Sequence, residues 1–303
     1  MPRKILISTR EGIRPALAPL VSAYAQRGIT VKWHIYAGEI PSEETLSKAS
    51  RTSDAALLIG CKRRAPRTVL SGPLLRRGDG KQIPVGWLPA HNPKDLSSFV
   101  SAAAKAHARA QETNSLALLA QRHPRYLRLI DRIESILCAP YVLRWSADAI
   151  RPEEMSKGLS MGLGSALYLG HGRPSGWVGY YGFRAKDLPP AKAPLGALLS
   201  LCCNTASRRN VGLSFAEALP LNGISASVLG AVDDTLHIDN TRLSVRLTQT
   251  IKEGAETLGD LVLRSFGSSQ NLFKSYRIIG DPLAPLKAPL TGLKQAQKLE
   301  LFP

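Results

Sequence analysis

A histidine and a cysteine that each close a short apolar run could together carry out nucleophilic chemistry. His171 follows the run Ser165–Gly170, and Cys203 ends the run Ala197–Cys203. A thiol is a strong nucleophile only as the thiolate, and a neighbouring imidazole can take its proton and later protonate a leaving amine. Gly172 has no Cβ, so its backbone N–H could approach a substrate oxyanion closely.

The two runs have the length and composition of buried parallel strands, which would place the histidine and the cysteine at strand ends. Ligands of open parallel sheets bind outside the carboxyl ends of the strands. The 32 residues between His171 and Cys203 are enough for one crossover connection. Spacing alone leaves an ordinary turn at His171 and a structural cysteine at Cys203 equally open.

Strand and helix patterns alternate through residues 1–111, which predicts an α/β subdomain with a parallel, helix-covered sheet. The expected strands are Lys4–Ser8, Ile29–Tyr36, Ala55–Gly60 and Ile83–Trp87, and the expected helices are Pro15–Arg27 and Lys94–Gln111.

The remaining residues predict a helical connector over 112–160, a second α/β series over 161–290 and a tail over 291–303. The connector contains an amphipathic helix over Arg125–Cys138. In the second series we expect strands at Ser165–Gly170, Ala197–Cys203 and Ile224–Val232, and helices near Gly212–Leu219, Leu236–Glu253 and Thr257–Ser265.

Several segments resemble the gingipain-type cysteine peptidases of the caspase-like clan. Tyr168–Gly172, with Trp177 shortly after, resembles their catalytic histidine segment, and Leu198–Thr205 resembles their nucleophile strand. Cys203-Asn204-Thr205 also resembles the CHAT branch of the clan, and Ile279–Leu283 is similar to the segment that closes gingipain-type catalytic domains. The similarity is scattered over most of residues 55–286.

This resemblance implies a caspase-like parallel sheet flanked by helices, preceded by a smaller α/β subdomain. It implies a cysteine endopeptidase with His171 as general acid/base and Cys203 as nucleophile, and an oxyanion hole made by the backbone amides of Gly172 and Cys203. The family's spacing favours Cys203 over Cys202, and neighbouring side chains of a strand point to opposite faces. No cofactor and no metal are expected.

The resemblance also suggests where a substrate would lie. In the clan the substrate pairs with the strand after the nucleophile helix. The expected substrate contacts are therefore Ser225, Val232, Asp233 and Asp234 of this strand and its end, together with Trp177 of the histidine segment.

The two aspartates could bind a basic residue before the scissile bond, which the family favours, or simply begin a helix. A preference for an acidic residue, held by Arg173, Arg208 or Arg209, is the alternative. Glu153 and Glu154 are the candidates for orienting His171, and His237 could line the cleft.

The net charge is +17, and residues 1–150 contribute most of it with 23 Lys/Arg against 11 Asp/Glu. This basic first half of the chain could attract an acidic partner or nucleic acid, or it could simply have an ordinary basic surface. No apolar run is long enough to span a membrane, and the N-terminus lacks the apolar stretch of a signal peptide. Four scattered cysteines predict neither a disulfide framework nor a zinc site, so we expect a cytoplasmic protein. A peptidase-like binding or scaffold protein without turnover remains the alternative to an enzyme.

Overall fold

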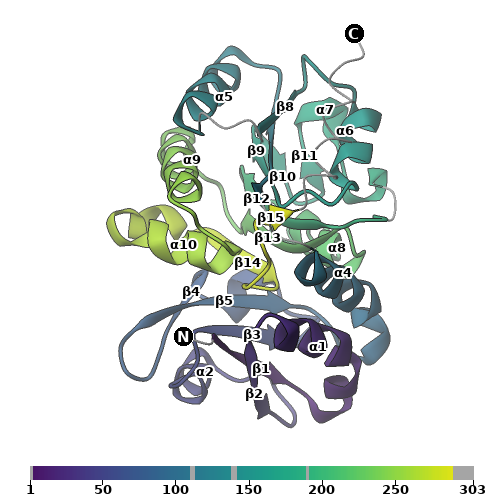
Figure 1. Cartoon of the computed structure of the whole chain (residues 1–303), viewed down its shortest axis with the longest axis vertical. Coiled ribbons are helices and arrows are strands. Elements are labelled where there is room, and N and C mark those ends of the chain that lie inside the picture. Colours follow the sequence, from purple (N-terminus) through teal and green to yellow (C-terminus); the bar gives the residue numbers. More distant parts are fainter. Residues whose placement is uncertain (1–2, 110–112, 138–141, 189–190, 289–303) are drawn as a thin grey trace.

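One large β-sheet runs through the computed structural model of the chain, which describes residues 3–109, 113–137, 142–188 and 191–288 (Figure 1). Within these residues eleven strands form the sheet, in the order β2-β1-β3-β5-β14-β13-β12-β9-β7-β8, with β4 paired to β5. Their bounds are β1 (Lys4–Thr9), β2 (Thr30–Ile35), β3 (Ala55–Ile59), β4 (Leu74–Arg76), β5 (Gln82–Leu88), β7 (Leu116–Ala120), β8 (Val142–Ser146), β9 (Ser165–Leu169), β12 (Leu195–Leu201), β13 (Ser225–Ala231) and β14 (Tyr276–Gly280). Two short pairs lie outside it: β6 (Thr113–Asn114) with β15 (Lys287–Ala288), and β10 (Gly172–Arg173) with β11 (Gly176–Trp177).

Most neighbouring strands of this sheet are parallel, and the exceptions within its described strands are β13 with β14 and β4 with β5. The central strands are buried along their whole length, as in the runs AALLI of β3 and LGALLSL of β12. Uninterrupted apolar strands are typical of parallel sheets that are covered on both faces. The predicted mostly parallel sheet flanked by helices is confirmed.

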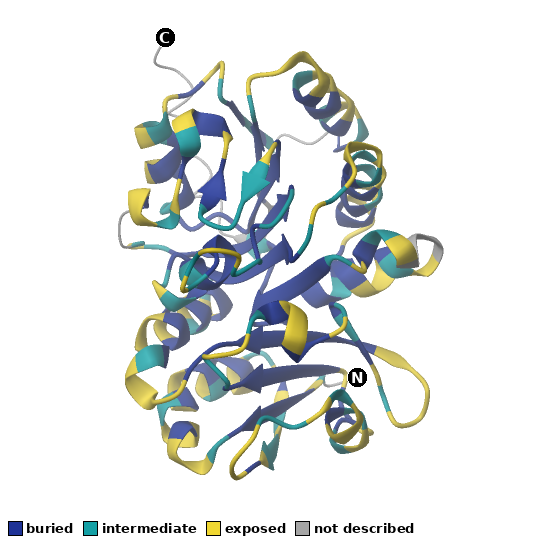
Figure 2. Cartoon of the chain, turned by 180° about the vertical axis from the view of Figure 1, so that it is seen from behind, coloured by how far each residue is buried: buried dark blue, intermediate teal, exposed yellow. Residues whose placement is uncertain are grey.

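Helices cover both faces of the sheet, and their outward surfaces carry the exposed residues (Figure 2). The helices are α1 (Ala18–Gln26), α2 (Glu43–Ala49), α3 (Pro66–Val69), α4 (Ser97–Ala108), α5 (Pro124–Leu137), α6 (Pro152–Leu159), α7 (Gly179–Gly182), α8 (Phe215–Leu221), α9 (His237–Lys252) and α10 (Leu258–Phe266). Shorter 3₁₀ helices are η1 (Glu11–Leu17), η2 (Pro93–Leu96), η3 (Ala185–Asp187) and η4 (Gly267–Phe273). On the part of the sheet that begins with β7 in the sequence, α5, α9 and α10 pack on one face, and α6 and α8 pack on the other face (Figure 1).

The two halves of the sheet are joined through β14, which is antiparallel to β13 and parallel to β5. Asp281, directly after β14, is fully buried and accepts a hydrogen bond from the Tyr24 hydroxyl at 2.7 Å. The other oxygen of this carboxylate lies 2.6 Å from Nε2 of His107 on α4. These buried contacts tie the end of β14 to two helices of the N-terminal half.

Residues 112–160, expected as a helical connector, supply β7 and β8 to the sheet in addition to α5 and α6. Each of these strands has five residues, and periodicity does not separate so short a segment from part of a helix. The expected tail, residues 291–303, lies outside the described residues.

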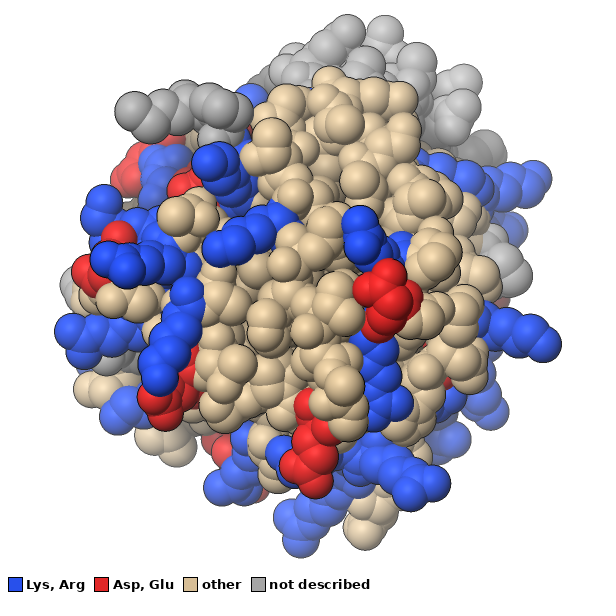
Figure 3. Space-filling model, turned by 90° about the horizontal axis from the view of Figure 1, so that it is seen from below, with Lys and Arg blue, Asp and Glu red and all other residues tan. Residues whose placement is uncertain are grey.

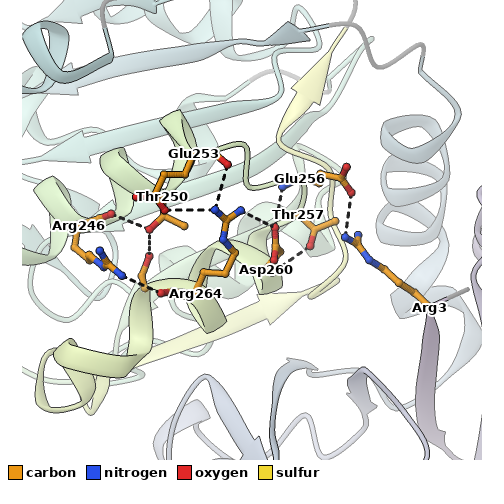
Figure 4. Close-up of polar contacts among 9 residues, drawn as sticks. Arg3, Arg246, Thr250, Glu253, Glu256, Thr257, Asp260 and Arg264 are labelled. Atoms are coloured by element: carbon orange, nitrogen blue, oxygen red, sulfur yellow. Dashed lines mark hydrogen bonds and ion pairs between the residues drawn. The ribbon is translucent and has the colours of Figure 1, made fainter. Parts of the chain in front are cut away.

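Polar contacts link both the start and the last turn of α10 to neighbouring segments (Figure 4). The Thr257 side chain caps the helix by accepting a hydrogen bond from the Asp260 amide at 3.2 Å. Arg264 pairs with Glu253 after α9, and Arg3 pairs with Glu256 at 3.0 Å. Such exposed ion pairs contribute little individually, about 0–1 kcal/mol, so the buried faces of α9 and α10 provide most of the stability here.

Among the described residues, no helix has the length and the apolar character that crossing a bilayer requires.

Candidate active site

The turns that carry His171 and Cys203 follow neighbouring parallel strands. β9 pairs with β12 so that Leu169 lies opposite Leu201, and each candidate residue comes two positions later. Leu169 and Leu201 both pack into the core under α5 and α9. Because side chains alternate along a strand, residues 171 and 203 continue on that same face. The sheet therefore brings the two turns together at its carboxyl edge.

The backbone of His171 is held on both sides. Its N–H donates to Oε1 of Gln121, the residue after β7, at 2.9 Å. Its carbonyl accepts hydrogen bonds from the Val178 amide at 2.9 Å and from the Tyr168 hydroxyl at 3.1 Å. The side chain is exposed and meets the ring of Tyr126 edge-on, with centroids 5.9 Å apart. The main chain is thus fixed while the imidazole faces outward.

Gly172 lies against the turn that carries the cysteine. A Cβ at this position would stand 2.5 Å from the Cys203 carbonyl oxygen and 2.5 Å from Sγ of Cys202. Contacts this short do not occur for real side chains, so the approach of the two turns requires a glycine here.

The adjacent cysteines differ in surroundings. Cys202 is fully buried on the other face of the sheet, where burial raises the pKa of its thiol to about 12. It therefore stays protonated and packs as a small apolar side chain. Cys203 is half-buried, and its Sγ lies 3.3 Å from the amide nitrogen of Thr235, in the loop before α9.

The turn after β12 is fastened to the turn after β13. The Asn204 amide donates to the Asp233 carbonyl at 3.1 Å, and the Asn204 side chain donates to the Asp234 carboxylate at 2.6 Å. Asn204 has φ of +61°, a left-handed conformation that asparagine tolerates better than most residues. Among the described residues, no hydrogen bond joins Cys203 to His171. The hydrogen bonds that the Cys203 sulfur makes there are with the amide, carbonyl and hydroxyl groups of Thr235.

His237, the first residue of α9, shares an aromatic neighbour with His171. Its ring lies 5.5 Å from that of Tyr126. Burial lowers the pKa of His237, and the positive charges of Arg125, His171 and His123 lower it further. The sequence placed this histidine only near the Asp233–Asp234 turn; its proximity to His171 depends on Tyr126 of α5, which no local pattern indicates.

A pocket beside Asn204 lies at the end of β13. Its lining residues are Ala65, Arg67, Thr68, Asn204, Ala206, Ser207, Arg208, Arg209, Val232, Asp233 and Asp234. Arg67 of α3 pairs with Asp233 at 2.8 Å, and these side chains are 68% and 41% exposed. The Arg67 guanidinium is therefore paired with the Asp233 carboxylate, which was expected to bind a basic substrate residue.

The arginines proposed for an acidic substrate residue differ in availability. Arg208 is bound to the fully buried carboxylate of Glu217 at 2.6 Å. Arg173 donates to the Gly182 carbonyl at 3.1 Å. Arg209 is exposed at the rim of the pocket, and none of the ion pairs found among the described residues includes it.

Two of the residues expected to contact the substrate, Trp177 and Ser225, have buried side chains. Trp177 has no exposed surface, because it stacks on Tyr168 at 4.2 Å and donates to the Ser200 hydroxyl at 2.9 Å. Ser225 is fully buried at the amino end of β13, opposite the edge that carries Cys203. A role for either residue in holding a substrate stays a prediction, and Val232, Asp233 and Asp234 line the pocket beside Asn204.

The carboxylates suggested for orienting His171 have other roles. Glu154 accepts a hydrogen bond from the Arg151 amide at 3.2 Å at the start of α6. Glu153 lines a separate pocket with Tyr180 and Tyr181. Neither contacts His171 among the described interactions, and the side chain that positions its main chain is Gln121.

The surface at the N-terminal end of the molecule mixes charges of both signs. Figure 3 shows Lys and Arg spread around this face, with Asp and Glu among them and uncharged residues across its middle. The basic excess of the first half is therefore not gathered into one stripe on this face.

Both the sequence and the fold of this chain are similar to those of known proteins. The model of Peptidase family C25 matches residues 75–287, and no curated protein matches the chain. The fold is similar to the Arg specific cysteine proteinase gingipain R, with a TM-score of 0.72 and 14% identity over 94% of this chain and 78% of that one. It is also similar to RgpB of Porphyromonas gingivalis in complex with its pro-domain, with a TM-score of 0.70 and 16% identity over 93% of this chain and 79% of that one. Saccharomyces cerevisiae separase, solved with securin, is more distant: its TM-score is 0.53 and its identity 18%, over 78% of this chain and 16% of that one.

Proposed function

The chain belongs to peptidase family C25, a family of cysteine peptidases, and we propose that it is an endopeptidase with Cys203 as nucleophile and His171 as general acid/base. The observation that carries this proposal is the in-register pairing of Leu169 with Leu201, from which both turns start on one face. The burial of Cys202 supports Cys203 as the reactive thiol.

The chemical steps follow from these roles. The His171 imidazole takes the proton of the Cys203 thiol, and the thiolate attacks the carbonyl carbon of the peptide bond. The oxyanion that forms accepts hydrogen bonds from the backbone N–H groups of Gly172 and Cys203. Collapse breaks the C–N bond, and the imidazolium protonates the departing amine and leaves a thioester on Cys203. His171 then takes a proton from water, which hydrolyses the thioester to an acid and restores the thiol.

For the substrate residue before the scissile bond we propose a basic side chain in the pocket beside Asn204. Asp233 and Asp234 supply its two carboxylates, and the fold neighbour named Arg specific is consistent with this chemistry. Arg67 already pairs with Asp233, so a basic substrate residue has to displace it. The exposed Arg209 supports the opposite preference, for an acidic residue, as the second candidate.

Cleavage of a proteome-derived peptide mixture tests activity and preference together. We expect new termini that follow Lys or Arg, produced by the wild-type chain and abolished in Cys203→Ala. Termini after Asp or Glu would support the acidic alternative. Full cleavage by Cys203→Ala would refute the assigned nucleophile.

A peptidase-like binding protein without turnover would cleave nothing in this assay. It would nevertheless retain the peptide as a stable complex, which distinguishes it from an inactive preparation. The cytoplasmic location and an acidic or nucleic-acid partner for the basic half stay predictions from the sequence.

A further inference from the structure

A line of hydrogen bonds that starts in the core ends at the sulfur of Cys203. The Tyr276 hydroxyl on β14 donates to Oδ1 of Asn240 at 2.7 Å. Nδ2 of Asn240, on α9, donates to Oγ1 of Thr235 at 2.9 Å. The Thr235 amide donates to Sγ of Cys203 at 3.3 Å, and its hydroxyl oxygen lies 3.5 Å from the same sulfur.

The orientation of the Asn240 amide is determined by its neighbours. Its nitrogen faces the Leu201 carbonyl at 3.4 Å, and a carbonyl can only accept a hydrogen bond. Tyr276 and Asn240 are buried, so water does not compete for these groups. Because Oγ1 of Thr235 accepts from Asn240, the hydrogen of this hydroxyl is free to point elsewhere. Its acceptors within reach are the sulfur and the Tyr276 oxygen.

The donors of Thr235 favour an anionic sulfur. A thiolate accepts the amide hydrogen and the hydroxyl hydrogen at once, and hydrogen bonds to a charged group are about twice as strong as neutral ones. The thiol form can instead donate its hydrogen to the carbonyl or the hydroxyl oxygen of Thr235, each at 3.5 Å, but it then forgoes accepting the hydroxyl hydrogen. Thr235 also immediately precedes Leu236, the N-cap of α9, and the positive end of a helix dipole stabilises a nearby anion.

We propose that Thr235 is a positioning residue that stabilises the thiolate of Cys203 in the free protein, with Asn240 fixing its hydroxyl as the donor. The thiol proton passes to the His171 imidazole or to water, and the sulfur keeps both electrons of the S–H bond. This inference rests on the proposed function, since it explains how the assigned nucleophile is made ready before a substrate arrives.

Other ionisable groups surround the sulfur and could change its titration. They are His171 after β9, Tyr126 of α5, Tyr276 of β14, Cys202 of the same turn, and Asp234 and His237 around the start of α9. A substitution at Thr235 removes none of these groups. It does take a hydrogen-bond partner from the Tyr276 phenol, but burial raises the pKa of that phenol well above 10, so it stays protonated over the range of the test. A changed titration of Cys203 therefore reports on Thr235 itself.

The test is the rate of alkylation of Cys203 by iodoacetamide from pH 5 to 10, measured by mass spectrometry in a Cys202→Ala background. Thr235→Val removes the hydroxyl and keeps the shape, and Thr235→Ser keeps the hydroxyl. The matched control is Thr241→Val on α9, whose hydroxyl donates to the His237 carbonyl. Thr235→Ala is the second hydroxyl-free variant if the valine variant does not fold.

We expect Thr235→Val to move the titration of Cys203 to higher pH and to slow alkylation at pH 7 about tenfold. Thr235→Ser and Thr241→Val should stay within about twofold of the parent. Identical profiles for a folded Thr235→Val or Thr235→Ala variant and the parent would overturn the proposal. Alkylation needs no turnover, so this result stands apart from a failure to cleave peptides.

Discussion

Gly172 and Cys203 lie so close that a methyl group on the glycine would stand 2.5 Å from the carbonyl oxygen of the cysteine. The histidine turn and the cysteine turn therefore touch through their backbones. The spacing of the two candidate catalytic turns at this edge depends on one residue without a side chain.

Gly172→Ala should lower the rate of peptide cleavage by about 100-fold, because separating the turns by even about 1 Å misplaces the reacting groups. Gly212→Ala is the matched control, since a Cβ there would meet no atom within 4 Å. The comparison is made on kcat/KM for one peptide. Equal losses for the two variants would show that the contact at Gly172 has no special role.

Arg67→Ala should raise kcat/KM for a substrate with a basic residue before the scissile bond by up to about fivefold. The reason is that it frees Asp233, and an exposed ion pair is worth about 0–1 kcal/mol. Asp233→Asn should lower the same parameter. Arg64→Ala, which breaks the neighbouring exposed pair with Glu39, is the control and should have no effect. A gain for acidic substrates in Asp233→Asn, with no loss for basic ones, would favour the opposite preference.

Arg208→Ala should destabilise the fold by about 3 kcal/mol, because it leaves the fully buried carboxylate of Glu217 without its cation. Arg209→Ala, next to it and exposed, should change the free energy of unfolding by less than about 0.5 kcal/mol. Urea denaturation of both variants measures the difference. Similar midpoints would mean that Glu217 is satisfied by its capping contacts with Ser214 alone.

Stability should fall as the pH rises above about 10, the usual pKa of a tyrosine phenol. Burial, first of all, raises the pKa of Tyr24, Tyr168 and Tyr276 well above that value in the folded chain. The unfolded chain then loses these protons first, so each phenol lowers the free energy of unfolding by about 1.4 kcal/mol per pH unit. Urea denaturation at pH 8 and pH 11 checks this. Phenolate absorbance that rises fully near pH 10 without unfolding would contradict it.

The strands that carry His171 and Cys203 could be predicted because their apolar runs are long and end in distinct polar turns. β14 could not be predicted as the strand that joins both halves, because its pairing with β5 and β13 is long-range. β7 and β8 were not predicted because strands of only five residues, the second of them interrupted by Arg144, carry little information beside a strong helix pattern.

The candidate site was predictable in its two central residues and not in their surroundings. Trp177 was expected as a substrate contact on the resemblance of its segment, and its burial follows from packing against Tyr168 and Ser200, which are distant in the sequence from one another. The contact of Cys203 with Thr235 and that of Tyr126 with His171 join distant segments. Such contacts follow from how α5 and α9 pack on the sheet, which no local pattern encodes.

We propose above all that Cys203 is the nucleophile and that His171 is its general acid/base. The most direct test of this proposal is mass spectrometry of the chain after reaction with a peptide chloromethyl ketone that ends in arginine. We predict one adduct, located on Cys203, formed by the wild-type chain and at least about 100-fold more slowly by His171→Ala. An adduct on Cys202, or one that forms on Cys203 at the same rate without His171, would contradict the account.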